Sequence, residues 1–218
     1  MKYKAVIFDL DGTLLNTLED LADAVNAALT KNGMPARGIG EVREFVGNGI
    51  GRLIERAVPE GTAPAVREQV LQEFRVHYKE HCRDKTAPYS AILEMLDRLH
   101  QAGLKMAVVS NKAEFAVKEL VPVYFGDRIM SVRGENEAAG IQKKPAPDMV
   151  YMALKECGCP PEKAVYVGDS EVDLKTAANV GLDCISVTWG FRQREWLIQH
   201  GARILAESPE ELCNKIME

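Results

Sequence analysis

Four aspartates, one lysine and two small hydrogen-bonding residues lie along the chain, mostly directly after short apolar runs. They are Asp9, Asp11, Ser110, Asn111, Lys144, Asp169 and Asp173. Several carboxylates in one place repel each other unless a positive group neutralises them. All-oxygen ligation suits a hard cation such as Mg²⁺, which also binds phosphate oxygens. Phosphoryl transfer needs an in-line nucleophile and positive charge on the phosphoryl oxygens, so these residue types indicate that chemistry if the fold brings them together.

Short apolar runs, rich in β-branched residues, must position these groups. The runs cover residues 5–8, 104–109, 164–167 and 184–187, with a weaker one at 130–132, and helical patterns lie between them at 92–99, 115–121, 149–154 and 174–180. Strands that alternate with helices predict an α/β fold, with a Rossmann-like parallel sheet and helices on both faces. Ligands bind at the carboxyl ends of such strands, so we expect the polar residues to converge in one crevice.

Residues 15–84 interrupt this alternation, because they contain helical patterns and no convincing strand. Apolar residues share one helix face at 18–29 and again at 66–78, and 53–57 is helix-like. We therefore predict an inserted all-helical cap domain at 15–84. The α/β core would be discontinuous and would consist of residues 1–14 and 85–218.

Composition limits the possible partners. The chain has 218 residues, a formal net charge of −5 and a pI of about 5.5, which argues against nucleic-acid binding. No stretch reaches the ~18 apolar residues of a membrane span, and the first apolar run meets Asp9 too early for a signal peptide. We expect a cytoplasmic protein that binds a small phosphorylated metabolite and neither membrane nor nucleic acid. Nothing in the sequence indicates an oligomeric state.

Four motifs resemble those of the haloacid dehalogenase superfamily, in that family's order and at similar strand ends. They are Asp9-Leu-Asp-Gly-Thr13, Ser110-Asn111, Lys144-Pro145 and Gly168-Asp-Ser-Glu-Val-Asp173. The first and fourth motifs are specific together, whereas the second and third count only by their position. The resemblance spans nearly the whole chain, because the helical insertion is similar to the C1 type of cap, which closes over a small substrate and excludes water.

The resemblance implies a Mg²⁺-dependent phosphoric monoester hydrolase. Asp9 would be the nucleophile and form an aspartyl-phosphate that water hydrolyses. Asp11 would protonate the leaving alcohol and then activate water. Its backbone carbonyl and the side chains of Asp9 and Asp169 would hold Mg²⁺, while Asp173 would hold a metal-bound water or orient a ligand.

The same resemblance assigns the phosphate-binding residues. Ser110, Asn111 and Lys144 would bind the phosphoryl group, and Gly12 and Thr13 would let the backbone approach it. The chain departs from the family at Asn16, where members commonly have Asp. That position lies near the expected hinge of the cap, so the change affects hinge or cap contacts more than the chemistry.

Three segments look most like phosphoglycolate phosphatases: 45–50, 166–173 and 187–192. By that analogy, the loop with Asn48 and Gly49 would reach the non-phosphate end of the substrate, and Arg43 or Arg52 would pair with a carboxylate there. A helix-breaking turn flanked by solvated arginines explains the same residues equally well.

Other activities remain open on the same core. They include hydrolysis of pyrophosphate or sugar phosphates and the β-phosphoglucomutase reaction. A phosphonatase would need a cap lysine near the nucleophile, and the early cap lysine Lys31 sits at a helix end. A dehalogenase would not need the acid Asp11. A catalytically silent phosphate-binding module or a receiver-type phospho-acceptor is disfavoured by the complete set of core groups.

Overall fold

A parallel sheet forms the centre of the molecule. The computed structural model describes residues 1–218, apart from the side chain of Glu137. Within them, six strands form the sheet in the order β5-β4-β1-β6-β7-β8, and every neighbouring pair is parallel. The strands are β1 (Ala5–Phe8), β4 (Lys105–Ala113), β5 (Ser131–Glu135), β6 (Ala164–Gly168), β7 (Asp183–Val187) and β8 (Ile204–Ala206). The predicted α/β fold is confirmed.

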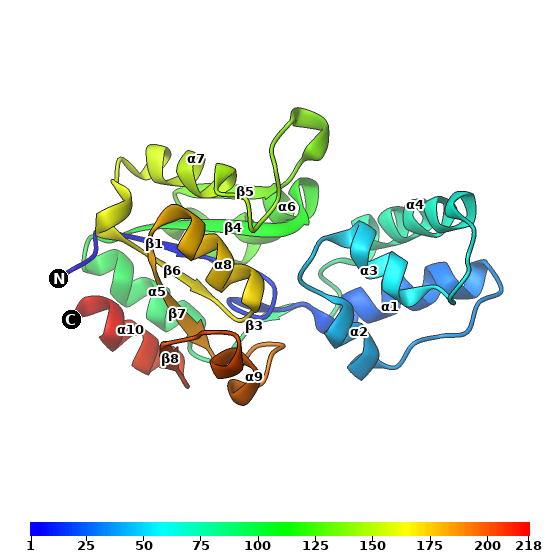
Figure 1. Ribbon diagram of the computed structural model, residues 1–218. Helices are drawn as coiled ribbons and strands as arrows, with labels where there is room; N and C mark the ends of the chain where they lie inside the picture. Colours follow the sequence, from blue (N-terminus) through cyan, green and yellow to red (C-terminus); the bar gives the residue numbers. More distant parts are fainter.

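Helices cover both faces of the sheet, as the apolar runs predict. Side chains alternate along a strand, so Val6 and Phe8 of β1 pack in one apolar cluster and Ala5 and Ile7 in another. The first cluster includes α5 (Ile92–Gln101), α6 (Glu114–Phe125) and α10 (Pro209–Met217), and the second includes α7 (Asp148–Cys157) and α8 (Glu171–Val180). Figure 1 shows α7 on the side of the sheet opposite α5 and α10.

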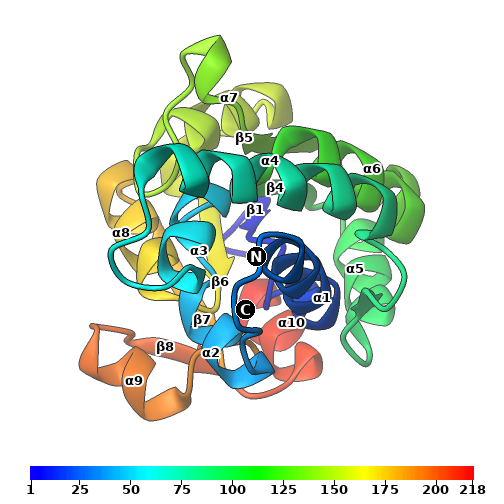
Figure 2. The same ribbon diagram turned by 90° about the vertical axis from the view of Figure 1, so that its right-hand side faces the viewer.

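The helical insertion forms a separate lobe beyond the carboxyl edge of the sheet (Figure 1). It contains α1 (Leu18–Lys31), α2 (Ile39–Phe45), α3 (Ile50–Ala57) and α4 (Pro64–His81). Two short antiparallel strands, β2 (Leu15–Asn16) and β3 (Ala87–Pro88), pair where the chain leaves and re-enters the core. We propose residues 15–84 as the cap domain and residues 1–14 and 85–218 as the core, because this pair closes the insertion. Figure 2 shows the cap helices in front of the strand ends.

Several short elements differ from the sequence expectation. β2 lies in the segment where no strand was expected, and β8, α2 and α9 (Arg194–Gln199) have no counterpart among the predicted elements. β2 and β8 have two and three residues, which is too short for a periodic pattern. In α2 the buried residue is Val42. Among the helices of the described residues, none is both long enough and apolar enough to cross a bilayer.

The central strand should dominate the stability of the core. Ile7 is fully buried in β1, so we expect Ile7→Ala to lower the free energy of unfolding by about 2–5 kcal/mol through lost contacts and a cavity. Urea unfolding followed by circular dichroism would measure the change. Ile198→Ala is the matched control, because Ile198 is 45% exposed and its truncation should change stability by less than about 0.5 kcal/mol. Equal losses in both variants would contradict this picture of the core.

Candidate active site

A pocket lies between the carboxyl edge of the sheet and the cap. β1 stands between β4 and β6, so the chain order reverses beside it, which is where open α/β sheets bind ligands. Core residues from the turn after β1, from β4 and from the loop after β6 line one side, and residues of α1, α3, α4 and the loop before α3 line the other. Its volume of about 50 Å³ holds a few water molecules. In this cap position the pocket is therefore sized for a small ligand.

Asp9 and Lys144 form the centre of the site. The Lys144 ammonium lies 2.9 Å from Asp9 Oδ1 and 2.8 Å from Asp173 Oδ1, and all three side chains are buried. Burial raises the pKa of Asp9 to about 7; Lys144 opposes this rise and Asp173 reinforces it. Burial lowers the pKa of Lys144, but Asp173 and Asp9 outweigh it and the net pKa is well above its usual range. Lys144 is thus a fixed cation beside a carboxylate that binds its proton unusually tightly.

Three buried carboxylates are arranged to hold a metal ion. Oxygen atoms of Asp9, Asp169 and Asp173 all lie within 4.8 Å of one another. Burial, followed by the charges of Asp173 and Asp9, raises the pKa of Asp169 well above its usual range. The cluster is therefore short of positive charge even beside Lys144, and its oxygen donors suit a hard divalent cation. The cluster contains Asp9 and Asp169, whose side chains were expected at the metal, and Asp173, which was expected beside it; the carboxylate of Asp11 contacts Thr17 and Lys112 instead.

Surrounding hydrogen bonds fix the two carboxylates that follow β6. Asp169 Oδ2 accepts from the Phe191 backbone N–H at 2.6 Å. Asp173 Oδ2 accepts from the backbone N–H and the hydroxyl of Ser170, at 3.1 and 2.7 Å. Asp173 Oδ1 accepts from the hydroxyl of Tyr166 at 3.2 Å. These partners hold the carboxylates against their mutual repulsion.

Asp11 lies between the core and the hinge of the cap. Its Oδ1 accepts from the Thr17 hydroxyl at 2.8 Å, and the Lys112 ammonium lies 3.0 Å from Oδ1 and 3.3 Å from Oδ2. The neighbouring Asn16 accepts through Oδ1 from the Leu18 backbone N–H at 3.3 Å, at the start of α1. The departure from the family pattern at Asn16 is therefore placed at the hinge and not among the core groups.

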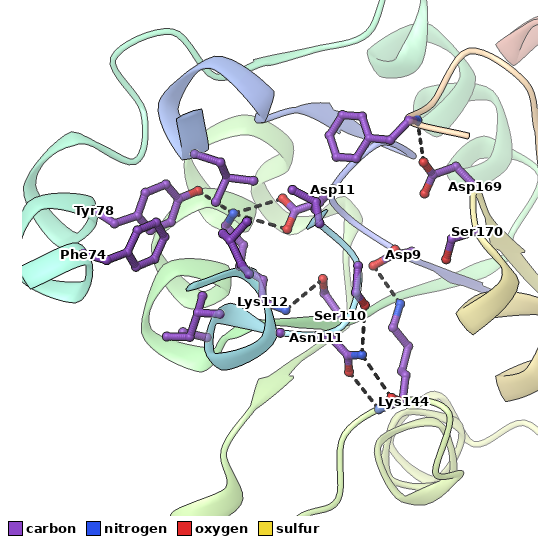
Figure 3. A pocket seen from close by; sticks show the side chains of 18 of the residues that line it. Asp9, Asp11, Phe74, Tyr78, Ser110, Asn111, Lys112, Lys144, Asp169 and Ser170 are labelled. Carbon is purple, nitrogen blue, oxygen red and sulfur yellow. Dashed lines mark hydrogen bonds and ion pairs between the residues drawn. The ribbon is translucent and has the colours of Figure 1, made fainter. Parts of the chain in front are cut away.

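Lys112 and Tyr78 line the pocket, although neither is among the site residues predicted from the sequence. The buried Lys112 ammonium donates to the Tyr78 hydroxyl at 2.5 Å and lies 4.7 Å from the centre of the Tyr78 ring. Figure 3 shows Lys112 between Tyr78 of the cap and Asp11 of the core. Lys112 directly follows Ser110 and Asn111 in the sequence, and this adjacency is a signal that could have placed it in the site. The apolar pattern of residues 66–78 places Tyr78 on the buried face of its helix, where its hydroxyl gives no signal of its own.

The two residues of the second motif, Ser110 and Asn111, have different surroundings. Ser110 lines the pocket, and its hydroxyl oxygen accepts from the Lys112 backbone N–H at 3.3 Å. Asn111 Oδ1 accepts from the Lys144 backbone N–H at 2.8 Å, and Asn111 Nδ2 donates to the Lys144 carbonyl at 3.0 Å and the Gly47 carbonyl at 3.2 Å. Asn111 therefore fixes the lysine loop and contacts the cap, while Ser110 can still donate to a ligand.

Gly12 and Thr13 bring the backbone close to Asp169. Gly12 has a φ of +81°, and a Cβ at this position would overlap the Asp169 carboxylate. The Thr13 hydroxyl donates to Asp169 Oδ1 at 3.5 Å. The turn after β1 thus packs directly against the Asp169 carboxylate of the acidic cluster, and a residue larger than glycine at position 12 would not fit there.

The residues expected to recognise the substrate from the cap have different surroundings. Gly49 lines the pocket, but Asn48, Arg43 and Arg52 are not among the described lining residues. Arg52 is 2.5 Å from Glu55 on the surface of the cap. The cations that line the pocket, Lys112, Lys144 and Arg192, all come from the core. The role of Arg43 and Arg52 therefore stays a prediction.

Arg192 ties the core to the cap. Its guanidinium donates to the carbonyls of Arg43 and Val46, both at 3.1 Å, and to that of Glu44 at 3.4 Å. These carbonyls lie at the carboxyl end of α2, where a helix attracts positive charge. Arg192 thus holds the end of α2 against the core.

Comparisons with known proteins agree with this geometry. Residues 6–187 match the family model described as haloacid dehalogenase-like hydrolase. A phosphoglycolate phosphatase from Pseudomonas syringae pv. syringae is 33% identical over 94% of this chain and 74% of its own length. An N-acetylmuramic acid 6-phosphate phosphatase from Pseudomonas aeruginosa is 30% identical over 98% and 95%. A crystal structure from Lactobacillus delbrueckii subsp. bulgaricus, provisionally named phosphoglycolate phosphatase, is 37% identical over 99% of both chains with a TM-score of 0.94.

The acidic cluster should make the fold sensitive to Mg²⁺. A cation that binds only the folded state at a hundred times its Kd stabilises it by about 2.7 kcal/mol, which corresponds to a rise in Tm of about 5–10 °C for a chain of this size. Scanning calorimetry with Mg²⁺ and with EDTA would measure the shift. We expect Asp169→Asn to abolish it and Asp127→Asn, outside the cluster, to retain it. An equal shift in both variants would place the cation elsewhere.

The Mg²⁺-dependent shift should also depend on pH. A protonated Asp9 is a poor ligand, and its pKa is raised to about 7, so we expect the shift to shrink as the pH falls through about 7. Without metal the sign reverses. Because folded Asp9 holds its proton more tightly than unfolded Asp9, it makes the free energy of unfolding fall as the pH rises from about 4 to about 7. A shift that does not change between pH 8 and pH 6 would contradict the assignment of Asp9 to the metal.

Proposed function

The chain belongs to the haloacid dehalogenase-like hydrolases, and we propose that this phosphatase hydrolyses a small phosphate monoester, foremost 2-phosphoglycolate, through an aspartyl-phosphate. The observation that carries the proposal is the convergence of Asp9, Lys144 and the acidic cluster at the strand-order reversal, under the cap. A nucleophile, a fixed cation and a metal-binding set in one enclosed pocket are what phosphoryl transfer requires.

Asp9 and Asp11 carry the covalent steps of the proposal. A carboxylate oxygen of Asp9 attacks phosphorus, the phosphorus–oxygen bond to the leaving group breaks, and Asp11 gives a proton to the departing oxygen. In the second half, Asp11 takes a proton from water as its oxygen attacks the aspartyl-phosphate, which releases inorganic phosphate and regenerates Asp9. The contact of Asp11 with Thr17 supports these roles, because it keeps the carboxylate oriented beside the pocket.

Positive charge must balance the phosphoryl oxygens beside three carboxylates. Lys144 supplies one fixed charge, already within ion-pair distance of Asp9. Asp9, Asp169 and Asp173 would hold Mg²⁺, which when bound supplies further charge to the phosphoryl oxygens. Ser110 would donate its hydroxyl hydrogen to a phosphoryl oxygen, and Asn111 keeps Lys144 in place through the two hydrogen bonds between them.

The cap limits which esters can enter. Its half of the pocket is lined by apolar side chains such as Leu21, Leu53 and Phe74, with Tyr78 as the polar exception among the described lining residues. Exclusion of water strengthens the electrostatic interactions within the pocket, and the small volume favours a short leaving group. The relatives named phosphoglycolate phosphatase support the same choice. Because another relative is named N-acetylmuramic acid 6-phosphate phosphatase, a larger phosphorylated sugar must also be tested as a substrate.

A panel of phosphate esters would test the proposal. It would contain phosphoglycolate, pyrophosphate, glucose phosphates, N-acetylmuramic acid 6-phosphate and nucleotides, each with Mg²⁺ and with EDTA, and would follow phosphate release. We expect Mg²⁺-dependent turnover with phosphoglycolate preferred. A preference for another ester would refute phosphoglycolate as the substrate but leave the proposed mechanism in place. No turnover of any member would refute the proposed hydrolysis.

Replacement of the nucleophile should abolish the covalent intermediate. We expect Asp9→Asn to lower kcat by at least about a thousandfold, because an amide oxygen cannot attack phosphorus in this way. Rapid acid quench with a radiolabelled substrate, followed by mass spectrometry, would locate phosphate on Asp9 of the wild type and not on the variant. Asp127→Asn serves as the surface control. Undiminished activity of Asp9→Asn would overturn the nucleophile assignment.

A further inference from the structure

Lys112 is a buried pocket cation that the roles above leave without a function. Its ammonium contacts Asp11 and Tyr78 at 3.0 and 2.5 Å. Lys144, in contrast, contacts Asp9 and Asp173. Figure 3 shows the two lysines approaching neighbouring carboxylates of the site from different directions. The pocket therefore has two separate positive centres, Lys144 beside Asp9 and Lys112 beside Asp11.

The position of Lys112 matches the leaving group of the substrate. Under the proposed function, phosphorus lies against Asp9 and the leaving oxygen lies against Asp11. The carbon skeleton attached to that oxygen must then extend on the Asp11 side, where Lys112 and the cap residue Tyr78 are found. The cap side chains around this region are otherwise apolar among the described lining residues.

Asp11 does not need Lys112 to fix its orientation. The Thr17 hydroxyl already donates to Asp11 Oδ1 at 2.8 Å, and an isolated β-bridge joins Asp11 to Leu15. A buried lysine costs free energy unless its charge is used or paired. Lys112 meets this requirement through its ion pair with Asp11 at 3.0 Å, which keeps a charged ammonium in the wall of the pocket beside the place of the leaving group.

Lys112 differs from the other pocket cations in its partners, which are Asp11 and the cap residue Tyr78. Burial lowers its pKa, but Asp11 and Tyr78 outweigh burial and raise it overall, so the side chain is charged at neutral pH. Arg192 is bound to carbonyls at the end of α2, and Lys144 is beside Asp9. A lysine ammonium has three donors on a flexible stem, so Lys112 can turn one donor toward an anion in the pocket.

We propose that Lys112, oriented by Tyr78, binds a second anionic group of the substrate, a carboxylate a short carbon chain away from the ester oxygen. The enzyme would then select phosphorylated hydroxy acids over neutral esters of similar size. This inference rests on the proposed function, because it uses the position of Asp11 at the leaving oxygen. It assigns recognition of the carboxylate to a core residue in place of Arg43 or Arg52.

Two esters that differ only in the second group would test the assignment. They are 2-phosphoglycolate and 2-hydroxyethyl phosphate, which has a neutral alcohol in place of the carboxylate. We expect Lys112→Met to lower the ratio of kcat/KM for the two esters by about 10–100-fold, the size expected for a lost charged hydrogen bond, mainly through KM for phosphoglycolate. Lys118→Met is the matched control, because Lys118 pairs with Glu114 on the surface of α6 and should leave the ratio unchanged.

A second variant, which keeps the charge of Lys112, tests the inference if Lys112→Met does not fold. Tyr78→Phe removes one hydrogen bond to the ammonium, so we expect the same ratio to fall by about fivefold. Equal losses on both esters in a folded variant would overturn the inference and make Lys112 a positioning residue for Asp11. So would a wild type without preference for phosphoglycolate over its neutral analogue. Failure of the proposed function would show differently, as a wild type that cleaves neither these esters nor any member of the panel.

Discussion

The site depends on one buried ammonium among carboxylates. Carboxylates taken out of water cost several kcal/mol each unless paired, and Lys144 pairs two of them, Asp9 and Asp173, within 3 Å. Its backbone is in turn fixed by Asn111. One lysine does not neutralise the cluster, because burial still raises the pKa of Asp9 to about 7 and raises that of Asp169 well above its usual value. The residual shortage of positive charge is the physical reason why the site suits a divalent cation and a substrate held with it.

Backbone approach is the second constraint on the site. β1 and β6 are adjacent. The turns that follow them, which carry Asp9 and Asp169, must therefore fit together in a small volume. A Cβ at Gly12 or Gly190 would overlap Asp169, and one at Gly190 would also overlap the Gly12 carbonyl. The turn after β1, the turn after β6 and the loop after β7 therefore pack against each other through glycine. The parallel sheet orders the functional groups along its edge, and these glycines allow that edge to close.

The sequence predicted the sheet and the core groups because both leave local signals. Buried parallel strands are continuous apolar runs, and the carboxylates follow them directly. The insertion was visible because strand patterns stop between residues 15 and 84. The features that could not be predicted depend on contacts between residues that are far apart in the sequence. Lys112 meets Asp11 across 101 positions and Tyr78 across 34, and no spacing rule connects them. Tyr78 fits the apolar face of α4 by its ring, which hides the function of its hydroxyl.

The cap and the chemistry are linked through the same few contacts. Tyr78 of α4 holds Lys112, the carbonyl of Gly47 accepts from Asn111, and Arg192 holds the end of α2. Each contact joins a cap element to a core residue in the pocket lining. A displacement of the cap would therefore release Lys112 from Tyr78 and Asn111 from Gly47 at the same moment that it admits water. The contacts that hold the cap against the core therefore also orient two side chains of the pocket, Lys112 and Asn111.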